Sequence, residues 1–294
     1  MQLLKRYSLL GEKFVPGEVV VRDALRVNTL KIKEEELVKR LEKKGVSLEK
    51  IGFARHGYYY NASFSLGATP EYLQGFYYLQ DAASQLPVQV LNPGQGELVL
   101  DMAASPGGKT TQLAQWMSNE GVIVALDSNG ARLDALANNL ERLSVKNVLA
   151  YKKDSRFAFD LGLSFDKVLL DAPCSGNFCV EKDFFKKRSA EDFKDKARVQ
   201  KELLKAAFKC LKPGGVLVYS TCSLEPEENE LVVQWFLENF EVSLADTGLE
   251  VGDEGLTRVF GKELVGSLSL TRRFWPHKTG TEGFFIAKLI KNKD

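Results

Sequence analysis

The sequence predicts an α/β protein built on a parallel sheet, with a small α/β module ahead of it. From residue 98 onward, short apolar runs alternate with segments of helical periodicity. Strands that alternate with helices pair in parallel, with the helices packed on the faces of the sheet. The start of the chain has a different pattern of residue types, so residues 1–75 are expected to form the small module and residues 76–294 the larger domain.

The elements of the larger domain alternate regularly. Apolar runs predict strands at 98–100, 122–126, 148–151, 168–170, 216–219 and 283–290, and helical periodicity predicts helices at 110–117, 129–143, 194–211 and 227–239. The third helix is expected to stop at Lys212-Pro213-Gly214-Gly215, because proline and glycine interrupt helices. Pro226 can begin the fourth helix, since a first-turn proline loses no helical hydrogen bond.

The small module is expected to combine a basic amphipathic start, a strand at 25–28, a charged helix at 33–44 and the aromatic cluster at 58–60. The sequence shows no internal repeat and no low-complexity linker after this module. We therefore expect the module to pack directly against the larger domain.

Composition argues against several classes of protein. The 40 basic and 39 acidic residues nearly cancel, so a nucleic-acid contact would need a local basic patch. No signal peptide is recognisable and no apolar run approaches the ~20 residues that cross a bilayer, which predicts a cytoplasmic protein without membrane contact. Four cysteines without a C-x-x-C pair and two histidines indicate neither a disulfide framework nor a metal site.

A loop of small residues, Asp101-Met102-Ala103-Ala104-Ser105-Pro106-Gly107-Gly108-Lys109, follows the first strand of the larger domain. It lies between a strand and a helix, where glycines let a ligand approach the backbone. The end of the loop resembles a phosphate-binding P-loop, but Ala103 stands where that motif needs its first glycine, and the dinucleotide motif G-x-G-x-x-G is absent. An adenosine-type cofactor without a phosphate cradle fits this loop better.

Four aspartates end or follow the first four strands of the sheet and are expected to form one rim: Asp101, Asp127, Asp154 and Asp171. Asp127 is placed to accept hydrogen bonds from ribose hydroxyls, with Arg132 about one helical turn beyond it. Asp154 could meet an adenine amino group, and Asp171 is expected near the reacting centre. Each aspartate alone could equally cap the next helix, but the repetition favours a ligand site.

Two of the four cysteines, Cys174 and Cys222, follow strands and lie in polar loops, so both thiols are expected on the same edge as the small-residue loop. A thiolate there could add to carbon 6 of a cytosine and make carbon 5 nucleophilic toward an activated methyl group. Loss of the carbon-5 proton and expulsion of the thiolate would then release the product, with a second acid or base assisting. Cys179 and Cys210 are expected to be ordinary buried cysteines.

Five motifs resemble the NOP/Sun family of RNA cytosine-5 methyltransferases: QDAAS (80–84), DMAASPGGKT (101–110), DAPCSG (171–176), STCSLEPEEN (220–229) and GTEGFFIAKL (280–289). The resemblance spans residues 25–291, and the two cysteine loops together are its most specific part. It implies a Rossmann-like class I methyltransferase sheet, S-adenosylmethionine as cofactor, and an RNA substrate.

The resemblance also implies roles for individual residues. Cys222 would be the nucleophile, Cys174 would assist release of the methylated RNA, and Asp171 would hold both the cofactor and the target base. The implied cofactor-binding residues are Ala103, Ala104, Ser105, Pro106, Gly107, Gly108, Lys109, Asp127, Arg132, Asp154 and Asp171.

The sequence departs from the family pattern in three places. Ser105 replaces the usual alanine, a small change that should leave cofactor binding intact. Asn177-Phe178-Cys179 follows DAPCSG in place of a glycine and a proline-bearing basic stretch, so the RNA-facing loop and the choice of substrate are expected to differ. No PUA-like extension is visible, which makes the short archaeal members that act on tRNA the nearest models, with rRNA a close second. The protein is expected to be a monomer.

RNA recognition would extrude the target cytosine, since carbon 5 must meet both the thiol and the methyl group. The basic residues expected to hold the surrounding RNA are Arg22, Arg26, Lys31, Lys186, Lys187, Arg188, Arg272 and Arg273. Two other hypotheses stay open. A DNA cytosine-5 methyltransferase would use a proline-cysteine loop, which Pro173-Cys174 supplies, and an inactive RNA-binding scaffold would bind cofactor without turnover.

Overall fold

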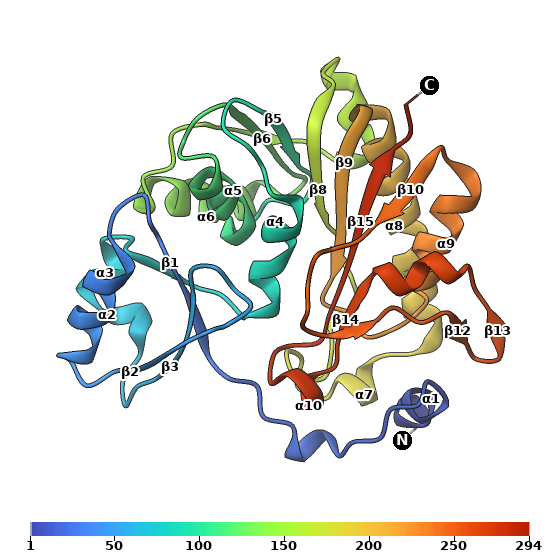
Figure 1. Ribbon diagram of the computed structural model, residues 1–294, viewed down its shortest axis with the longest axis horizontal. Helices are drawn as coiled ribbons and strands as arrows, with labels where there is room; N and C mark the ends of the chain where they lie inside the picture. The colour runs from blue at the N-terminus through green and yellow to red at the C-terminus, as the bar shows by residue number, and fades with distance from the viewer. Residues whose placement is uncertain (1, 294) are drawn as a thin grey trace.

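The computed structural model describes residues 2–293, which form a small sheet and a large sheet in one molecule (Figure 1). Within these residues the large sheet has nine strands and the small sheet has four. A separate hairpin pairs β12 (Arg258–Val259) with β13 (Lys262–Glu263).

Five parallel strands form the centre of the large sheet. In spatial order they are β7 (Val148–Lys152), β6 (Val122–Asp127), β5 (Leu98–Asp101), β8 (Phe165–Asp171) and β9 (Leu211–Thr221). The chain runs from β5 to β6 and β7 on one side and then returns to β8 and β9 on the other, so the strand order reverses between β5 and β8. Ligands bind beside the carboxyl ends of the strands at such a reversal.

Four antiparallel strands extend the sheet beyond β9. They are β15 (Phe284–Lys291), which pairs with β9, then β14 (Arg272–Phe274) and β11 (Asp253–Glu254), and β10 (Val242–Ala245), which pairs with the end of β15. The predicted α/β class with a parallel, Rossmann-like sheet is confirmed. Of this antiparallel part, the sequence predicted only the closing strand.

Helices cover both faces of the large sheet. On one face, α4 (Leu86–Leu91) and α5 (Gly108–Trp116) share a hydrophobic cluster with Val99. On the other face, α8 (Ala190–Cys210) and α9 (Glu230–Asn239) share a cluster with Leu100, because neighbouring residues of a strand point to opposite faces. Helix α6 (Gly130–Arg142) packs beside α5, and the 3₁₀ segment η4 (Ser155–Leu161) packs against α8. In the part of the chain that the structure describes, no helix combines the length and apolar character that a bilayer crossing requires.

Two predicted starts near β9 are wrong: that of the strand at 216 and that of the helix at 227. The preceding helix, α8, ends at Cys210, beside the expected stop. The proline-glycine run at 212–215 lies within β9, because pairing with β8 starts at Leu211 and resumes at Val216 after a shift of register. The irregular stretch between them tolerates residues that regular strands exclude.

The last long helix, α9, begins at Glu230 and not beside Pro226. The Asn229 side chain accepts a hydrogen bond from Thr221 Oγ1 at 2.6 Å and donates one to Ser223 O at 2.9 Å. These bonds hold Asn229 out of the helical conformation, so the helix starts one residue later.

The small sheet has the strand order β2 (Ser47–Lys50), β3 (Gly57–Asn61), β1 (Ala24–Val27) and β4 (Tyr77–Leu79), with every pair antiparallel. Helix α2 (Glu34–Glu42) and the short α3 (Pro70–Leu73) belong to the same part of the molecule. Because β4 pairs with β1, the small sheet extends to Leu79.

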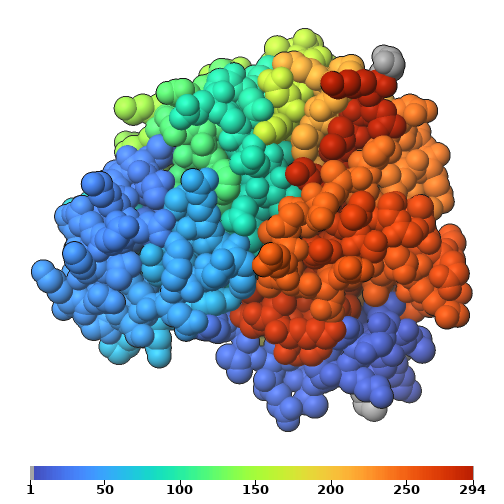
Figure 2. All heavy atoms as spheres, in the orientation of Figure 1, coloured from blue at the N-terminus to red at the C-terminus, as the bar shows by residue number. Residues whose placement is uncertain are grey.

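The N-terminal helix α1 (Gln2–Leu9) lies away from the small sheet and against the larger domain, near α7 (Phe184–Lys187) and α10 (Pro276–Thr279) (Figure 1). Leu3 packs with Phe184 and Phe193 of the larger domain. Figure 2 shows this N-terminal segment, in dark blue, beside the orange and red C-terminal part of the chain.

Arg26 of β1 joins the small sheet to helix α5 of the larger domain. Its side chain is buried and donates hydrogen bonds to Gln80 Oε1 at 2.7 Å, Gly108 O at 2.7 Å and Thr111 Oγ1 at 2.9 Å. Burial without a carboxylate partner lowers the pKa of Arg26 to about 9. The prediction that Arg26 contacts RNA is therefore wrong, because every strong contact of its guanidinium lies inside the protein.

We predict that Arg26→Ala destabilises the fold, since the truncation removes the guanidinium that donates to Gln80 Oε1 and Thr111 Oγ1 inside the protein. The free energy of unfolding, measured by urea denaturation, should fall by about 3 kcal/mol. Arg22→Ala is the matched control, because the Arg22–Glu49 ion pair is exposed and such pairs contribute roughly 0–1 kcal/mol. Equal stability of the two variants would contradict the role of Arg26.

Candidate active site

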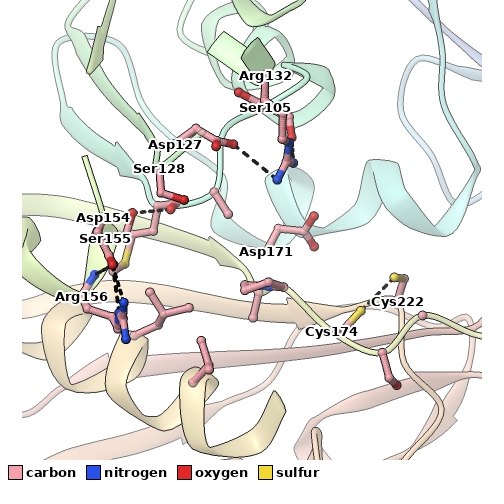
Figure 3. Close-up of a pocket in the computed structure, with 18 of the residues that line it drawn as sticks. Ser105, Asp127, Ser128, Arg132, Asp154, Ser155, Arg156, Asp171, Cys174 and Cys222 are labelled. Atoms are coloured by element: carbon pink, nitrogen blue, oxygen red, sulfur yellow. Dashed lines mark hydrogen bonds and ion pairs between the residues drawn. The ribbon is translucent and has the colours of Figure 1, made fainter. Parts of the chain in front are cut away.

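A cavity of about 580 Å³ opens beside the carboxyl ends of the parallel strands (Figure 3). It lies at the point where the strand order reverses. The predicted residues that line it are Ala103, Ser105, Asp127, Arg132, Asp154, Asp171, Cys174 and Cys222. The remaining predicted cofactor residues, Ala104, Pro106, Gly107, Gly108 and Lys109, are not part of its lining.

The loop after β5 is shaped by small residues that lie beneath the cavity wall. Ala104 is buried in a cluster with Ala125 and Leu136. Gly107 has φ +107°, and a Cβ at this position would lie 2.9 Å from a Leu136 side-chain carbon. Glycine is therefore required at 107 by both the backbone conformation and the close packing.

Asp101 does not join the expected rim of four aspartates. Its carboxylate is buried, accepts a hydrogen bond from Thr110 Oγ1 at 2.7 Å and does not line the cavity. Burial raises the pKa of Asp101 to about 6 despite the hydrogen bond from Thr110. Asp101 thus ties the start of the loop to α5, and three of the four aspartates face the cavity.

Asp127 and Arg132 border the cavity at the end of β6. Asp127 Oδ1 accepts a hydrogen bond from the backbone of Asn129 at 2.9 Å, and Asp127 Oδ2 lies 3.7 Å from Arg132 Nη1. Arg132 Nη2 donates to the carbonyl of Ser105 at 2.6 Å. The Ser105 hydroxyl is buried and finds no hydrogen-bond partner within residues 2–293.

Asp154 lines the cavity and also caps the segment that follows it. Its carboxylate accepts a hydrogen bond from the backbone of Arg156 at 3.0 Å and pairs with the Arg156 guanidinium at 2.6 Å. The capping and ligand-site interpretations of this aspartate are therefore compatible. Sequence reasoning missed Ser128, Ser155 and Arg156, which also line the cavity and lie within two residues of a predicted aspartate.

Asp171 is held by two partners at the end of β8. Its Oδ2 accepts from Lys109 Nζ at 2.7 Å, and its Oδ1 accepts from Ser220 Oγ at 2.7 Å. Burial alone would lower the pKa of Lys109, but the Asp171 carboxylate outweighs that effect and the pKa is raised. Lys109 therefore stays positively charged behind the carboxylate.

Cys174 and Cys222 lie side by side, with 2.9 Å between their sulfur atoms (Figure 3). The two loops meet because β8 and β9 are neighbouring parallel strands in which Asp171 pairs with Ser220. The hydrogen bond to Cys222, burial, and the nearby carboxylate of Glu228 raise the pKa of Cys174 well above its usual range. Cys174 is thus a protonated thiol beside Cys222.

The other two cysteines differ from each other. Cys210 is buried in the core, as expected for an ordinary cysteine. Cys179 is only partly buried, contrary to that expectation. Among residues 2–293, no group of three or more histidine, cysteine, aspartate or glutamate side chains could hold a metal ion.

The other basic candidates for RNA contacts lie in four different surroundings. Arg22, Lys31, Lys186 and Lys187 are exposed, and Arg188 lines the cavity and donates to Ser175 O at 3.1 Å. Arg272 is partly buried and donates to backbone carbonyls. Arg273 is buried against Glu230 at 2.7 Å, so the prediction that it contacts RNA is wrong.

A sheet with this strand order, and a cavity at its reversal point rimmed by strand-end aspartates, define the class of Rossmann-like proteins that bind a ligand at the switch point. Comparison with known families narrows the class. The model of the 16S rRNA methyltransferase RsmB/F family matches residues 88–290, and that of the N-terminal domain of 16S rRNA methyltransferase RsmF matches residues 13–82. The chain belongs to the RsmB/F family, and its resemblance to NOP/Sun proteins is confirmed.

Similar proteins cover the chain almost completely. The human 28S rRNA (cytosine(4447)-C(5))-methyltransferase is 46% identical over 97% of this chain and 36% of its own length. The tRNA (cytosine(49)-C(5))-methyltransferase of Pyrococcus abyssi is 38% identical over 99% of this chain and 96% of its own. The crystal structure of a methyltransferase homolog from Pyrococcus horikoshii has a TM-score of 0.86 and 44% identity, covering 98% of this chain and 90% of that one. The chain spans only 36% to 48% of the length of three eukaryotic rRNA relatives.

We predict that Asp101 makes stability fall as pH rises. Its pKa is about 6 in the folded protein against a usual 3.8, so the folded state binds the proton more tightly and ionisation between pH 4 and 7 is unfavourable. Asp101→Asn cannot ionise. The wild type should therefore lose about 3 kcal/mol of unfolding free energy relative to this variant across that interval. Urea titrations at successive pH values measure the unfolding free energy of both proteins. If the two curves of unfolding free energy against pH run parallel, the pKa of Asp101 is not raised in the folded state.

Proposed function

We propose that this protein transfers a methyl group from S-adenosylmethionine to carbon 5 of a cytosine in RNA, with Cys222 as the nucleophile. The observation that carries the proposal is the contact between the thiols of Cys174 and Cys222 at the wall of the cavity. Family membership and the names of its relatives support the same reaction.

The residues of the cavity fit an adenosine-type cofactor. Asp127 keeps acceptor capacity beyond its bonds to Asn129 and Arg132, which suits ribose hydroxyls. Asp154 could accept from an adenine amino group, and the buried hydroxyl of Ser105 still has its hydrogen-bonding capacity to satisfy. When bound, S-adenosylmethionine supplies the activated methyl group. The loop residues Ala104, Pro106, Gly107 and Gly108 do not line the cavity and act indirectly, by shaping the backbone that borders it.

Cys222 and Asp171 act on the cytosine. The Cys222 thiolate forms a bond to carbon 6, and the electron pair of the 5,6 double bond makes carbon 5 nucleophilic. Asp171, held by Lys109 and Ser220, can accept a hydrogen bond from the exocyclic amino group and so orient the ring. Because Asp171 also borders the cavity, it can contact the cofactor and the base together.

Cys174 assists release. After methylation, a base takes the proton from carbon 5, and its electron pair re-forms the 5,6 double bond. The bond between carbon 6 and Cys222 then breaks, with its electron pair returning to the sulfur. Cys174 remains protonated, so it can donate a hydrogen bond to the departing thiolate at the observed contact of 2.9 Å.

The substrate class rests on two comparisons. The Pyrococcus abyssi relative that matches this chain from end to end is named a tRNA enzyme, which favours tRNA. Three eukaryotic rRNA relatives are more identical to this chain, at 44–46%, which makes rRNA the second candidate. Bisulfite sequencing of tRNA and rRNA from cells with and without the gene distinguishes them. A monomeric, cytoplasmic enzyme stays our prediction.

We predict that Cys222→Ala abolishes the covalent adduct with RNA transcripts that contain 5-fluorocytosine, incubated with S-adenosylmethionine. Fluorine at carbon 5 cannot leave as the proton does, so the wild-type adduct persists and is visible on a denaturing gel. Cys174→Ala should still form the adduct, and on ordinary RNA it should accumulate one, because release is slowed. If the adduct is lost only in Cys174→Ala, the nucleophile is misassigned and the proline-cysteine mechanism of DNA enzymes applies.

We predict that Asp127→Asn weakens binding of S-adenosylhomocysteine about 30-fold, which corresponds to one charged hydrogen bond of roughly 2 kcal/mol. Isothermal titration calorimetry measures this affinity without RNA or turnover. Asp134→Asn is the control, since Asp134 is an exposed aspartate on the same helix as Arg132. Unchanged affinity in Asp127→Asn would rule out the ribose contact.

A further inference from the structure

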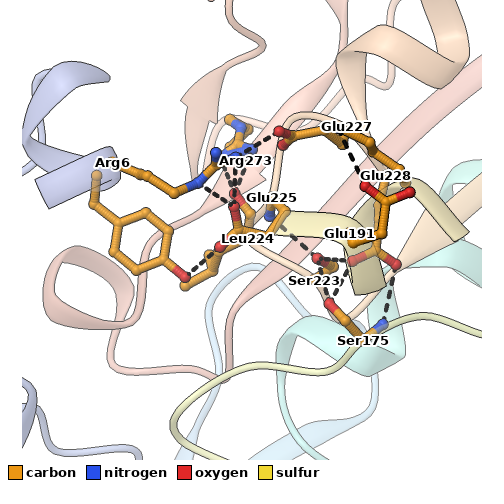
Figure 4. Close-up of polar contacts among 11 residues, drawn as sticks. Arg6, Ser175, Glu191, Ser223, Leu224, Glu225, Glu227, Glu228 and Arg273 are labelled. Atoms are coloured by element: carbon orange, nitrogen blue, oxygen red, sulfur yellow. Dashed lines mark hydrogen bonds and ion pairs between the residues drawn. The ribbon is translucent and has the colours of Figure 1, made fainter. Parts of the chain in front are cut away.

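The two cysteine loops share a buried carboxylate, that of Glu228 (Figure 4). Glu228 Oε2 accepts hydrogen bonds from the backbone of Ser175 at 3.0 Å and from Gln200 Nε2 at 2.9 Å. Glu228 Oε1 accepts from the hydroxyls of Ser175 and Ser223, the latter at 2.8 Å. Ser175 directly follows Cys174, and Ser223 directly follows Cys222, so one side chain connects the residues next to both thiols.

The surroundings of Glu228 differ from those of the other buried glutamates nearby. Glu225 pairs with Arg6 at 3.2 Å, and Glu230 pairs with Arg273 at 2.7 Å. Within residues 2–293, no basic side chain pairs with Glu228, although it is as fully buried as the other two. A buried carboxylate without a cation is costly unless several donors surround it. Its four hydrogen-bond donors meet that requirement, and three of them belong to the serines beside the thiols.

The fourth donor, Gln200, belongs to α8 and connects Glu228 to that helix. Gln200 Nε2 also donates to Pro173 O at 3.1 Å, on the other side of Cys174 from Ser175. The Cys174 loop is therefore held on both sides, and Ser223 connects the Cys222 loop to the same carboxylate. Burial raises the pKa of Glu228, whereas the hydrogen bonds from Ser175 and Ser223 oppose that shift.

We infer that Glu228 is a positioning residue, whose carboxylate holds the Cys174 and Cys222 loops together so that the two thiols stay in contact beside the cavity. The inference rests on the proposed function and adds a residue that touches neither cofactor nor RNA. Glu228 lies outside the cavity lining and acts through Ser175 and Ser223.

The test compares Glu228→Ala with Glu228→Gln in the full-length protein. In Glu228→Ala the loops lose their common acceptor, and the rate of adduct formation with 5-fluorocytosine RNA should fall about 100-fold, as expected for a misplaced reacting group. Glutamine can accept from the Ser175 backbone and from Gln200, while the two hydroxyls turn to accept from its amide. Glu228→Gln should therefore recover most of the rate, within about tenfold of wild type, since neutral hydrogen bonds are roughly half as strong as charged ones.

Two measurements separate positioning from general loss of structure. Calorimetric affinity for S-adenosylhomocysteine should be unchanged in Glu228→Ala, because no contact of Glu228 reaches the loop after β5. Glu225→Ala is the matched control, since it removes an equally buried carboxylate of the same turn that bonds α1 through Arg6 and Tyr7. Its stability should fall, but the folded protein should form adduct at close to the wild-type rate.

The outcomes distinguish the inference from the proposed function. If the wild type forms no adduct with tRNA or rRNA transcripts, the proposed function fails, and the inference fails with it. If the wild type forms adduct and Glu228→Ala forms it equally fast, only the inference is overturned. It is also overturned if Glu225→Ala slows adduct formation as much as Glu228→Ala, or if Glu228→Gln does not recover the rate.

If Glu228→Ala does not fold, Glu228→Gln and Ser223→Ala provide the test. Ser223→Ala should slow adduct formation, and an unchanged rate would overturn the inference.

Discussion

The parallel pairing of β8 with β9 is the constraint on which the rest of the site depends. It sets Asp171 opposite Ser220, so that the loops beginning at these residues leave the sheet side by side. The hydrogen bond from Ser220 to Asp171 fastens the two strand ends, and Lys109 joins them to the helix after the first loop. Without this register, the thiols of Cys174 and Cys222, which are 48 residues apart in the chain, would not be brought into contact.

Hydrogen-bonded carboxylates hold the elements of the site together. Asp101 holds Thr110, Asp171 holds Lys109, and Glu228 holds the serines that follow the two cysteines. The buried carboxylates of Asp101 and Glu228 would be costly if their donors moved away. The arrangement therefore resists displacement of the reacting groups, and small displacements of such groups lower rates steeply.

The parts outside the large sheet are fastened to the same region. Arg26 of the small sheet donates to the first turn of α5, next to the loop that borders the cavity. Helix α1 bonds Glu225, in the turn that carries Glu228, through Arg6 and Tyr7. The small module is therefore fastened beside the loop after β5, and α1 is fastened to the turn that follows Cys222. The exposed residues Arg22 and Lys31 lie on that module.

The sequence by itself determined the α/β class, the alternation of strands and helices, and the strand ends that carry Asp127, Asp171, Cys174 and Cys222, because local periodicity and small-residue loops are properties of neighbouring residues. Tertiary structure alone decided which polar side chains turn inward. Asp101 and Arg26 look like surface groups in the sequence, yet both are buried, since their partners come from elements distant in the chain. Glu228 lies in the motif STCSLEPEEN, but the sequence gave it no role for the same reason: three of its four donors belong to residues 28 and 53 positions away, brought to it by strand order and helix packing.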